Sequence, residues 1–180
     1  MRLGLLYEEL VIATGKVDPL VMARESCLLV IKESLERGYN FYSAAAHISA
    51  ERVQDRRGDH VASAEHYEQA IDAYEASLTS IEYRPLRDRV QEVTNYTRAW
   101  NLIERAKACH KREDHLPAKE NYEKASGILA KLPSYNYEAS YYSAWASHEE
   151  AEQLSKQENH EEAITRYETT IKDFDDSIKI

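Results

Sequence analysis

The chain has 180 residues, of which 43% are hydrophobic and 31% charged, and its formal net charge at pH 7 is −9. This length suits one domain with a sizeable core, and this hydrophobic content excludes a disordered chain. The negative charge argues against nucleic acids and anionic membranes as partners, and no apolar run approaches the roughly 20 residues that membrane insertion needs.

Capping residues and a few helix breakers divide the chain into eight predicted helices. The first covers residues 3–13 and stops at Gly15, and the second covers residues 18–38 after the cap Asp18. The third and fourth cover residues 40–57 and 59–82, with Gly58 breaking the chain between them. The last four are expected over residues 84–111, 114–132, 134–158 and 159–178. This order predicts an all-α fold.

A short block recurs three times and defines the repeat. A His is followed seven residues later by a Tyr, in the pairs His60 and Tyr67, His115 and Tyr122, and His160 and Tyr167. Each His follows a candidate N-cap: Asp59, Asp114 or Asn159. The blocks lie 55 and then 45 residues apart, and Trp100 and Trp145 each stand 15 residues before their His. We therefore predict helical hairpins over residues 40–82, 85–132 and 134–178.

A weaker fourth hairpin is predicted over residues 1–38, so that a single helical-repeat domain would cover residues 1–180. Apolar steps of three and four support helices, with stripes that superpose 100 residues apart. These stripes are Ala64, Tyr67, Ile71, Tyr74 and Leu78, and Ile164, Tyr167, Ile171, Phe174 and Ile178.

The second helix of each hairpin resembles that of a tetratricopeptide repeat, in which small and aromatic residues alternate at fixed steps. The matching sets are His60, Ser63, Tyr67 and Ala70; His115, Ala118, Tyr122 and Ala125; and His160, Ala163, Tyr167 and Thr170. In the first helix, Ala106 and Ala151 match a small residue of the family, whereas Glu51 departs from it. The resemblance implies an α-α superhelix of about four antiparallel hairpins, with longer helices than the family's usual period of about 34 residues.

The three repeated histidines could suggest a metal site, but we expect them to be packing positions. Equivalent positions on successive helical hairpins should be about 8–10 Å apart, whereas the nitrogens that bind one Zn²⁺ each lie about 2.1 Å from it. Together with Tyr67, Tyr122, Tyr167, Trp100 and Trp145, they are interpreted as repeat-packing residues. Neither a metal nor another cofactor is expected.

Motifs of enzymes are not recognised in the sequence, so an enzyme is not expected. It contains no His-Glu-x-x-His segment, no glycine-rich phosphate loop and no nucleophile elbow. Adjacent carboxylates, such as Glu149 with Glu150, Glu161 with Glu162 and Asp175 with Asp176, are expected on solvated helix faces. The cysteines Cys27 and Cys109 are expected to be buried free thiols, which indicates the reducing cytoplasm.

Basic residues recur on the first helices of the hairpins. Arg52 and Arg56 share a face, Lys107 and Lys111 occupy the equivalent positions, and Lys156 keeps one of them. In tetratricopeptide proteins the first helices line a concave groove, so the resemblance implies a groove that could hold an acidic or C-terminal carboxylate peptide. The alternative is a solvated face with salt bridges inside each helix, such as Glu104 with Lys107.

The two predicted helices of residues 1–38 are apolar around much of their circumference. Such helices need burial on several sides, so a second subunit could cover them and form a homo-oligomer. The alternative is that the second helix is enclosed by the first and third.

The sequence favours a cytoplasmic scaffold or adaptor for protein–protein interaction. A small-molecule-sensing regulatory module and a structural assembly subunit remain alternatives.

Overall fold

The computed structural model describes residues 25–32 and 40–178, and every regular element in these ranges is helical. The chain forms two compact units, residues 1–97 and 98–180, and the division falls within one helix. The predicted helix over residues 3–13 and most of the one over 18–38 lie outside the described residues, as does the proposed cover of the N-terminal hairpin. In the described part, no helix has an apolar stretch long enough to cross a membrane.

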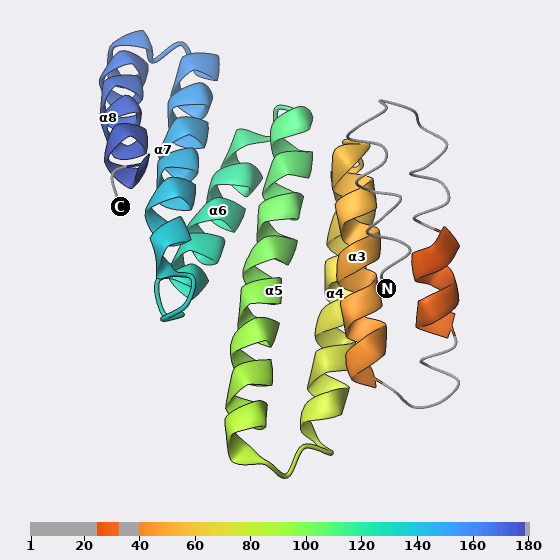
Figure 1. The fold of residues 1–180 in the computed structure, drawn as a ribbon. Coiled ribbons are helices and arrows are strands. Elements are labelled where there is room, and N and C mark those ends of the chain that lie inside the picture. Colours follow the sequence, from red (N-terminus) through yellow and green to blue (C-terminus); the bar gives the residue numbers. More distant parts are fainter. Residues whose placement is uncertain (1–24, 33–39, 179–180) are drawn as a thin grey trace. The chain divides into compact units, whose positions relative to one another are not determined.

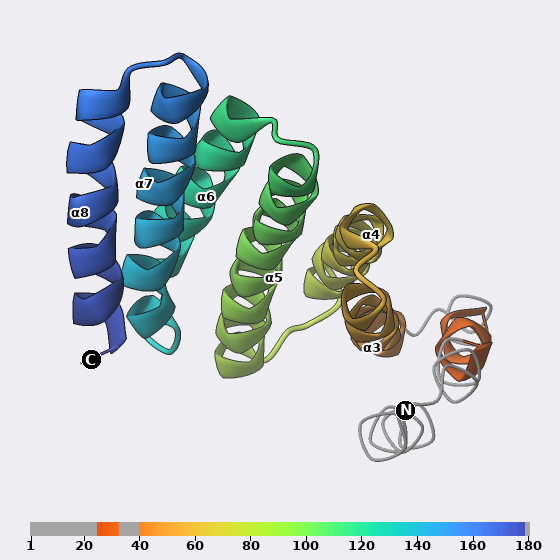
Figure 2. The same cartoon turned by 90° about the horizontal axis from the view of Figure 1, so that it is seen from above.

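The first unit is built around an antiparallel pair of helices, α3 (Asn40–Arg56) and α4 (His60–Leu78), which lie side by side (Figures 1 and 2). The first half of α5 (Arg84–Lys111) completes its core. Ala44 and Ala70 are fully buried where the helices meet, and Tyr74 and Val90 fill the space beside them. Small residues allow the helix axes to approach closely. The ring of Tyr74 then fills the space that the alanines leave in the core.

The second unit contains the other half of α5, then α6 (His115–Leu129), α7 (Ala139–Lys156) and α8 (His160–Ile178). Helix α7 lies between α6 and α8 and packs against both (Figures 1 and 2). Alanines occupy many of the fully buried positions of these helices, as in the first unit. They are Ala99, Ala106, Ala118, Ala125, Ala144 and Ala151.

Aromatic side chains form the centre of the second unit. The ring of Tyr122 on α6 stacks on Tyr142 and Trp145 of α7, with centroids 6.1 and 5.9 Å apart. Trp100 meets Tyr142 edge to face at 6.0 Å, and Trp145 meets Phe174 of α8 at 5.6 Å. Rings in these arrangements contribute beyond their buried area, so this ladder joins four helices into one core.

The predicted packing tyrosines differ in burial. Tyr67 and Tyr122 are buried, with 7% and 3% of their surface exposed. Tyr167 is half-buried on α8, where its ring meets His148 at 6.0 Å, and burial raises its pKa to about 12. Burial has this effect because it removes water that would otherwise solvate the charged phenolate.

Three turns have the same backbone form, in register with the sequence repeat. Gly58, Glu113 and Glu158 have φ of 68°, 59° and 62°, in the left-handed region. In each turn the following amide N–H donates back over five residues: Asp59 to Gln54, Asp114 to Cys109 and Asn159 to Leu154, all at 3.0 Å. This is the Schellman end of a helix. The three turns therefore share one backbone form at the places where the sequence block recurs.

Of two predicted N-caps, the structure confirms the side-chain hydrogen bond of Asp59 but not that of Asp114. The side chain of Asp59 accepts from the backbone N–H of Ala62 at 3.2 Å, as an N-cap should. Asp114 occupies the equivalent position but its side chain makes no cap hydrogen bond, because its carboxylate accepts from Arg112 Nε at 3.0 Å. The local ion pair thus replaces the cap.

Helix ends also differ from the sequence prediction at three points. Helices α4 and α6 end at Leu78 and Leu129, each earlier than expected. Helix α7 begins at Ala139 instead of residue 134, because Tyr135 has φ −137°, which lies outside the helical region. A 3-10 turn over Asn136–Glu138 joins this bend to α7.

From the left-handed turns we predict that replacement by glycine changes the free energy of unfolding in opposite directions at two nearby sites. Glu158→Gly should raise the free energy of unfolding by roughly 0.5–1 kcal/mol, because glycine adopts positive φ without strain. The control Glu161→Gly, in the first turn of α8, should lower it by about 1 kcal/mol or less. Urea denaturation measures both changes. Equal destabilisation by the two variants would contradict the turn assignment.

Candidate functional site

An unusual polar group of the second unit is the carboxylate of Glu149 on α7. Its side chain has no solvent exposure, although the sequence places it in an adjacent acidic pair that was expected on a solvated face. That expectation was wrong for Glu149, and its neighbour Glu150 is half-buried. A buried carboxylate is costly unless it is hydrogen-bonded or paired, so its surroundings must supply donors.

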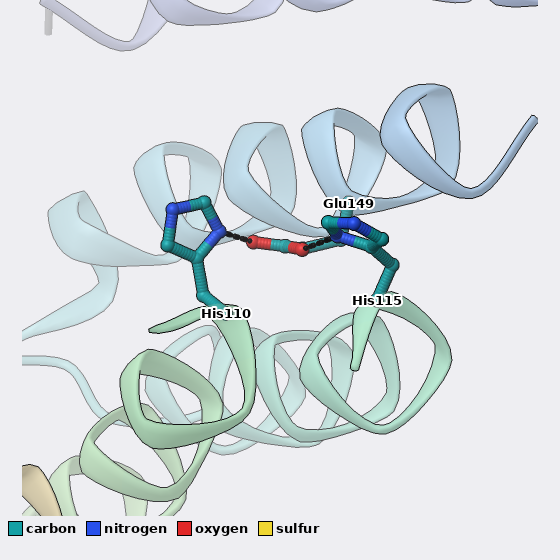
Figure 3. Close-up of side chains that lie close together, drawn as sticks. All are labelled: His110, His115 and Glu149. Carbon is teal, nitrogen blue, oxygen red and sulfur yellow. Dashed lines mark hydrogen bonds and ion pairs between the residues drawn. The ribbon is translucent and has the colours of Figure 1, made fainter. Parts of the chain in front are cut away.

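Two histidines supply these donors, one to each carboxylate oxygen. Nδ1 of His110 lies 2.7 Å from Oε1 of Glu149, and Nδ1 of His115 lies 2.9 Å from Oε2. The two imidazoles flank the carboxylate, and each directs Nδ1 toward it (Figure 3). A carboxylate accepts only, so each Nδ1 carries the hydrogen that it donates. We call these three residues the His-Glu-His cluster.

The turn between α5 and α6 positions the two rings. His110 is in the last turn of α5, and His115 is the first residue of α6. The N–H of Glu113 donates to the carbonyl of His110 at 2.9 Å, and Glu113 takes the left-handed conformation that reverses the chain. The side chains can therefore reach one carboxylate of α7 from two different helices.

The cluster is shielded from solvent at His115 and accessible to solvent at His110. The side chain of His115 is 9% exposed, whereas that of His110 is 44% exposed. The ring of Trp145 meets His110 edge to face at 6.0 Å, and Tyr122 lies buried nearby on α6. Burial raises the pKa of Tyr122, and the charge of Glu149 raises it further. The tyrosine consequently stays neutral beside the carboxylate.

Glu150 forms a separate ionic link between three helices. Its carboxylate pairs with Arg166 of α8 and lies 3.2 Å from Nζ of Lys119 on α6. Burial works against ionisation of Glu150, but its hydrogen bonds to the two cations outweigh this and lower its pKa. Neighbouring carboxylates on α7 thus bind different partners: Glu149 two imidazoles, and Glu150 two cations.

The three repeated histidines occupy different environments. His115 belongs to the cluster, whereas His60 is half-buried with its Nδ1 3.6 Å from Asp55, and His160 is exposed. Asp55 stands in the same register as His110, five residues before the repeated His. The repeat position thus carries different side-chain chemistry in each hairpin.

A second histidine pair lies in the first unit. Nδ1 of His47 on α3 lies 3.3 Å from Nδ1 of His66 on α4, so one ring donates to the other. Burial lowers the pKa of His47 to about 4, and the charge of His66 adds to the effect. His47 is therefore neutral near pH 7.

The predicted basic groove residues divide between the two units. Arg52 and Arg56 are exposed on α3, and Lys111 is exposed at the end of α5. Lys107 Nζ lies 2.5 Å from Glu104, the salt bridge that was the alternative to a groove. Lys156 Nζ donates to the carbonyl of Glu113 at 3.0 Å. Lys107 and Lys156 thus bind groups within the second unit, and the groove itself stays a prediction.

A small open pocket lies in the first unit, with a volume of about 290 Å³. The start of α3 contributes Phe41 and Tyr42, the end of α4 contributes Ser77, and α5 contributes Leu86 and Val90. Aromatic and aliphatic side chains dominate this lining, as is usual for pockets that take small apolar ligands.

Sequence reasoning missed the His-Glu-His cluster. His110 and His115 are five residues apart across a helix break, and Glu149 follows 34 residues later on another helix. One signal was available, since Glu104 and Glu149 both lie 11 residues before their repeated His. A glutamate that keeps the repeat register is a candidate for a structural role.

No protein-family model, curated protein or solved structure matches this chain.

Replacing the cluster's carboxylate tests its role in stability. Glu149→Gln should lower the free energy of unfolding by about 2 kcal/mol. The glutamine amide has one oxygen atom, so it cannot give each of the two imidazole N–H groups an acceptor oxygen of its own. The control Glu120→Gln makes the same change at an exposed residue of α6 and should have little effect. Urea denaturation followed by circular dichroism compares them, and equal midpoints would contradict the assignment.

Proposed function

We propose that this chain is a tetratricopeptide-like helical-repeat module that binds a partner protein. Support comes from the three matching turns, from alanines buried at repeat positions and from an uncovered apolar stripe on α8. The stripe carries the proposal. Its members are Ile164, Ile171 and Ile178, which are 59%, 63% and 77% exposed.

The stripe has helical spacing, with one isoleucine every seven residues. Such residues lie on one face of a helix, and contiguous exposed apolar surface marks interaction sites. In the first unit, Leu78 stands 100 residues before Ile178 and packs against a core that includes Val90 of α5. The same face of a second helix is thus covered in one hairpin and uncovered in the other. Because a helix covers this face in the first hairpin, we expect a helix to cover the stripe on α8 as well.

Charges beside the stripe specify the partner further. Glu168 and Asp175 are exposed and follow Ile164 and Ile171 by four residues, so they lie on the same face. Self-pairing of this face would bring carboxylates together, which disfavours a second copy. We therefore propose an apolar partner helix flanked by lysine or arginine. This partner differs from the acidic peptide expected for the basic groove, which remains a separate proposal.

A substitution within the stripe tests the proposal. Ile171→Glu should weaken partner binding about 10- to 100-fold, because a buried isoleucine contributes roughly 1.5–3 kcal/mol and a buried charge costs more. The control Thr169→Glu adds the same charge at an exposed position away from the stripe. Both tagged variants and the unchanged chain are used for quantitative affinity purification from the native host.

The supporting result is a protein retained by the unchanged chain and by Thr169→Glu but lost with Ile171→Glu. Retention by all three contradicts a role for α8. A protein lost only with Arg52→Glu plus Lys107→Glu would transfer the function to the basic groove. Sedimentation velocity detects the remaining outcome, in which a second copy of the chain covers the stripe.

A small-molecule sensor is the second candidate, and the open pocket beside Phe41 and Tyr42 is the observation that favours it. In that case a small apolar compound would raise the unfolding temperature of both α8 variants equally.

A further inference from the structure

We propose that His110, His115 and Glu149 form a binding site for one divalent transition-metal ion, for which Zn²⁺ is the best match. Each residue offers one ligand atom, and these atoms all lie within 4.8 Å of one another. In the absence of a metal ion, the cluster is held together by two hydrogen bonds to Glu149. A metal ion would replace the two imidazole hydrogens and bind both Nδ1 atoms and one oxygen of Glu149.

The donor set selects the class of metal. Two imidazole nitrogens and one carboxylate oxygen are the ligands of Zn²⁺ sites that keep a fourth position open. Calcium and magnesium prefer oxygen ligands throughout, so one carboxylate beside two imidazoles suits them poorly. The fourth position would take water or a group from a ligand, because the group contains three ligand residues among those that the structure describes.

The geometry requires a modest closure. Bonds of about 2.1 Å in a tetrahedral site place the ligand atoms about 3.4 Å apart. Because the present ligand atoms lie within 4.8 Å of one another, no pair must approach by more than about 1.4 Å. The ring of His110 can make this movement because its side chain is 44% exposed. His115 and Glu149 are buried and would form the fixed part of the site.

Charge and proton balance also favour a cation. With neutral imidazoles the ionised cluster carries one negative charge on Glu149, which has no solvent exposure. With a divalent ion bound, the net charge of the cluster becomes +1. Solvent can reach this charge on the side of His110, whose side chain is 44% exposed. Each ring moves its hydrogen from Nδ1 to Nε2 and presents the Nδ1 lone pair, so no net proton is released.

The other repeats lack this combination. The residue five before the repeated His is Asp55 in the first hairpin and Ser155 in the third, and only the middle hairpin has His110 there. The turn that presents these side chains has the same backbone hydrogen bonds in all three places. The paired imidazoles are therefore a property of the middle turn, and the turn itself does not require them.

The test titrates Zn²⁺ alone into the full chain after treatment with EDTA, by calorimetry and by competition with a chromophoric chelator. The expected result is one Zn²⁺ per chain with a dissociation constant in the micromolar range or below. His115→Asn should weaken binding roughly 100-fold or more. This variant keeps a donor to Glu149, so loss of binding would not follow from loss of the fold.

A matched control and a second readout complete the test. His160→Asn changes the exposed histidine at the same repeat position and should leave affinity and stoichiometry unchanged. Bound Co²⁺ should give visible d–d absorption in the unchanged chain and in His160→Asn, but not in His115→Asn or Glu149→Gln. The proposal is overturned if the unchanged chain binds no stoichiometric Zn²⁺. It is equally overturned if both cluster variants bind as tightly as the unchanged chain.

Discussion

A carboxylate removed from water needs hydrogen-bond donors in fixed positions, and the second unit is arranged around one such group. Glu149 on α7 receives one imidazole from the end of α5 and one from the start of α6. These bonds join three helices at one point. The aromatic ladder from Trp100 to Phe174 fills the space between the same helices and α8. Non-directional packing and directional hydrogen bonding thus define one arrangement together.

Three helix-ending turns share one backbone form, while the side chains around them differ. Gly58, Glu113 and Glu158 make the same left-handed turn, although only one of them is glycine. The first hairpin buries Glu51, which accepts from Ser63 at 3.1 Å, where the later hairpins bury alanine pairs. One supporting framework can thus present a hydrogen-bonded pair, an imidazole cluster or an apolar stripe.

Most of the local structure followed from the sequence. Gly58 and Asp59 predicted the first hairpin turn, and the limits of α5 were confirmed at Arg84 and Lys111. These features depend on neighbouring residues, which the sequence shows directly. The cluster around Glu149 depends on which helix faces meet, and an adjacent pair of glutamates does not show which one faces inward. The all-helical fold was confirmed for the described residues, whereas the superhelix remains a proposal.

Imidazole NMR directly tests whether Glu149 accepts hydrogen bonds from two Nδ1–H groups. Long-range ¹H–¹⁵N spectra of the metal-free chain near neutral pH report which ring nitrogens carry hydrogen. We predict protonated Nδ1 in both His110 and His115, with both signals changed by Glu149→Gln. Unprotonated Nδ1 atoms in both rings would contradict it, because two lone pairs would then face a carboxylate.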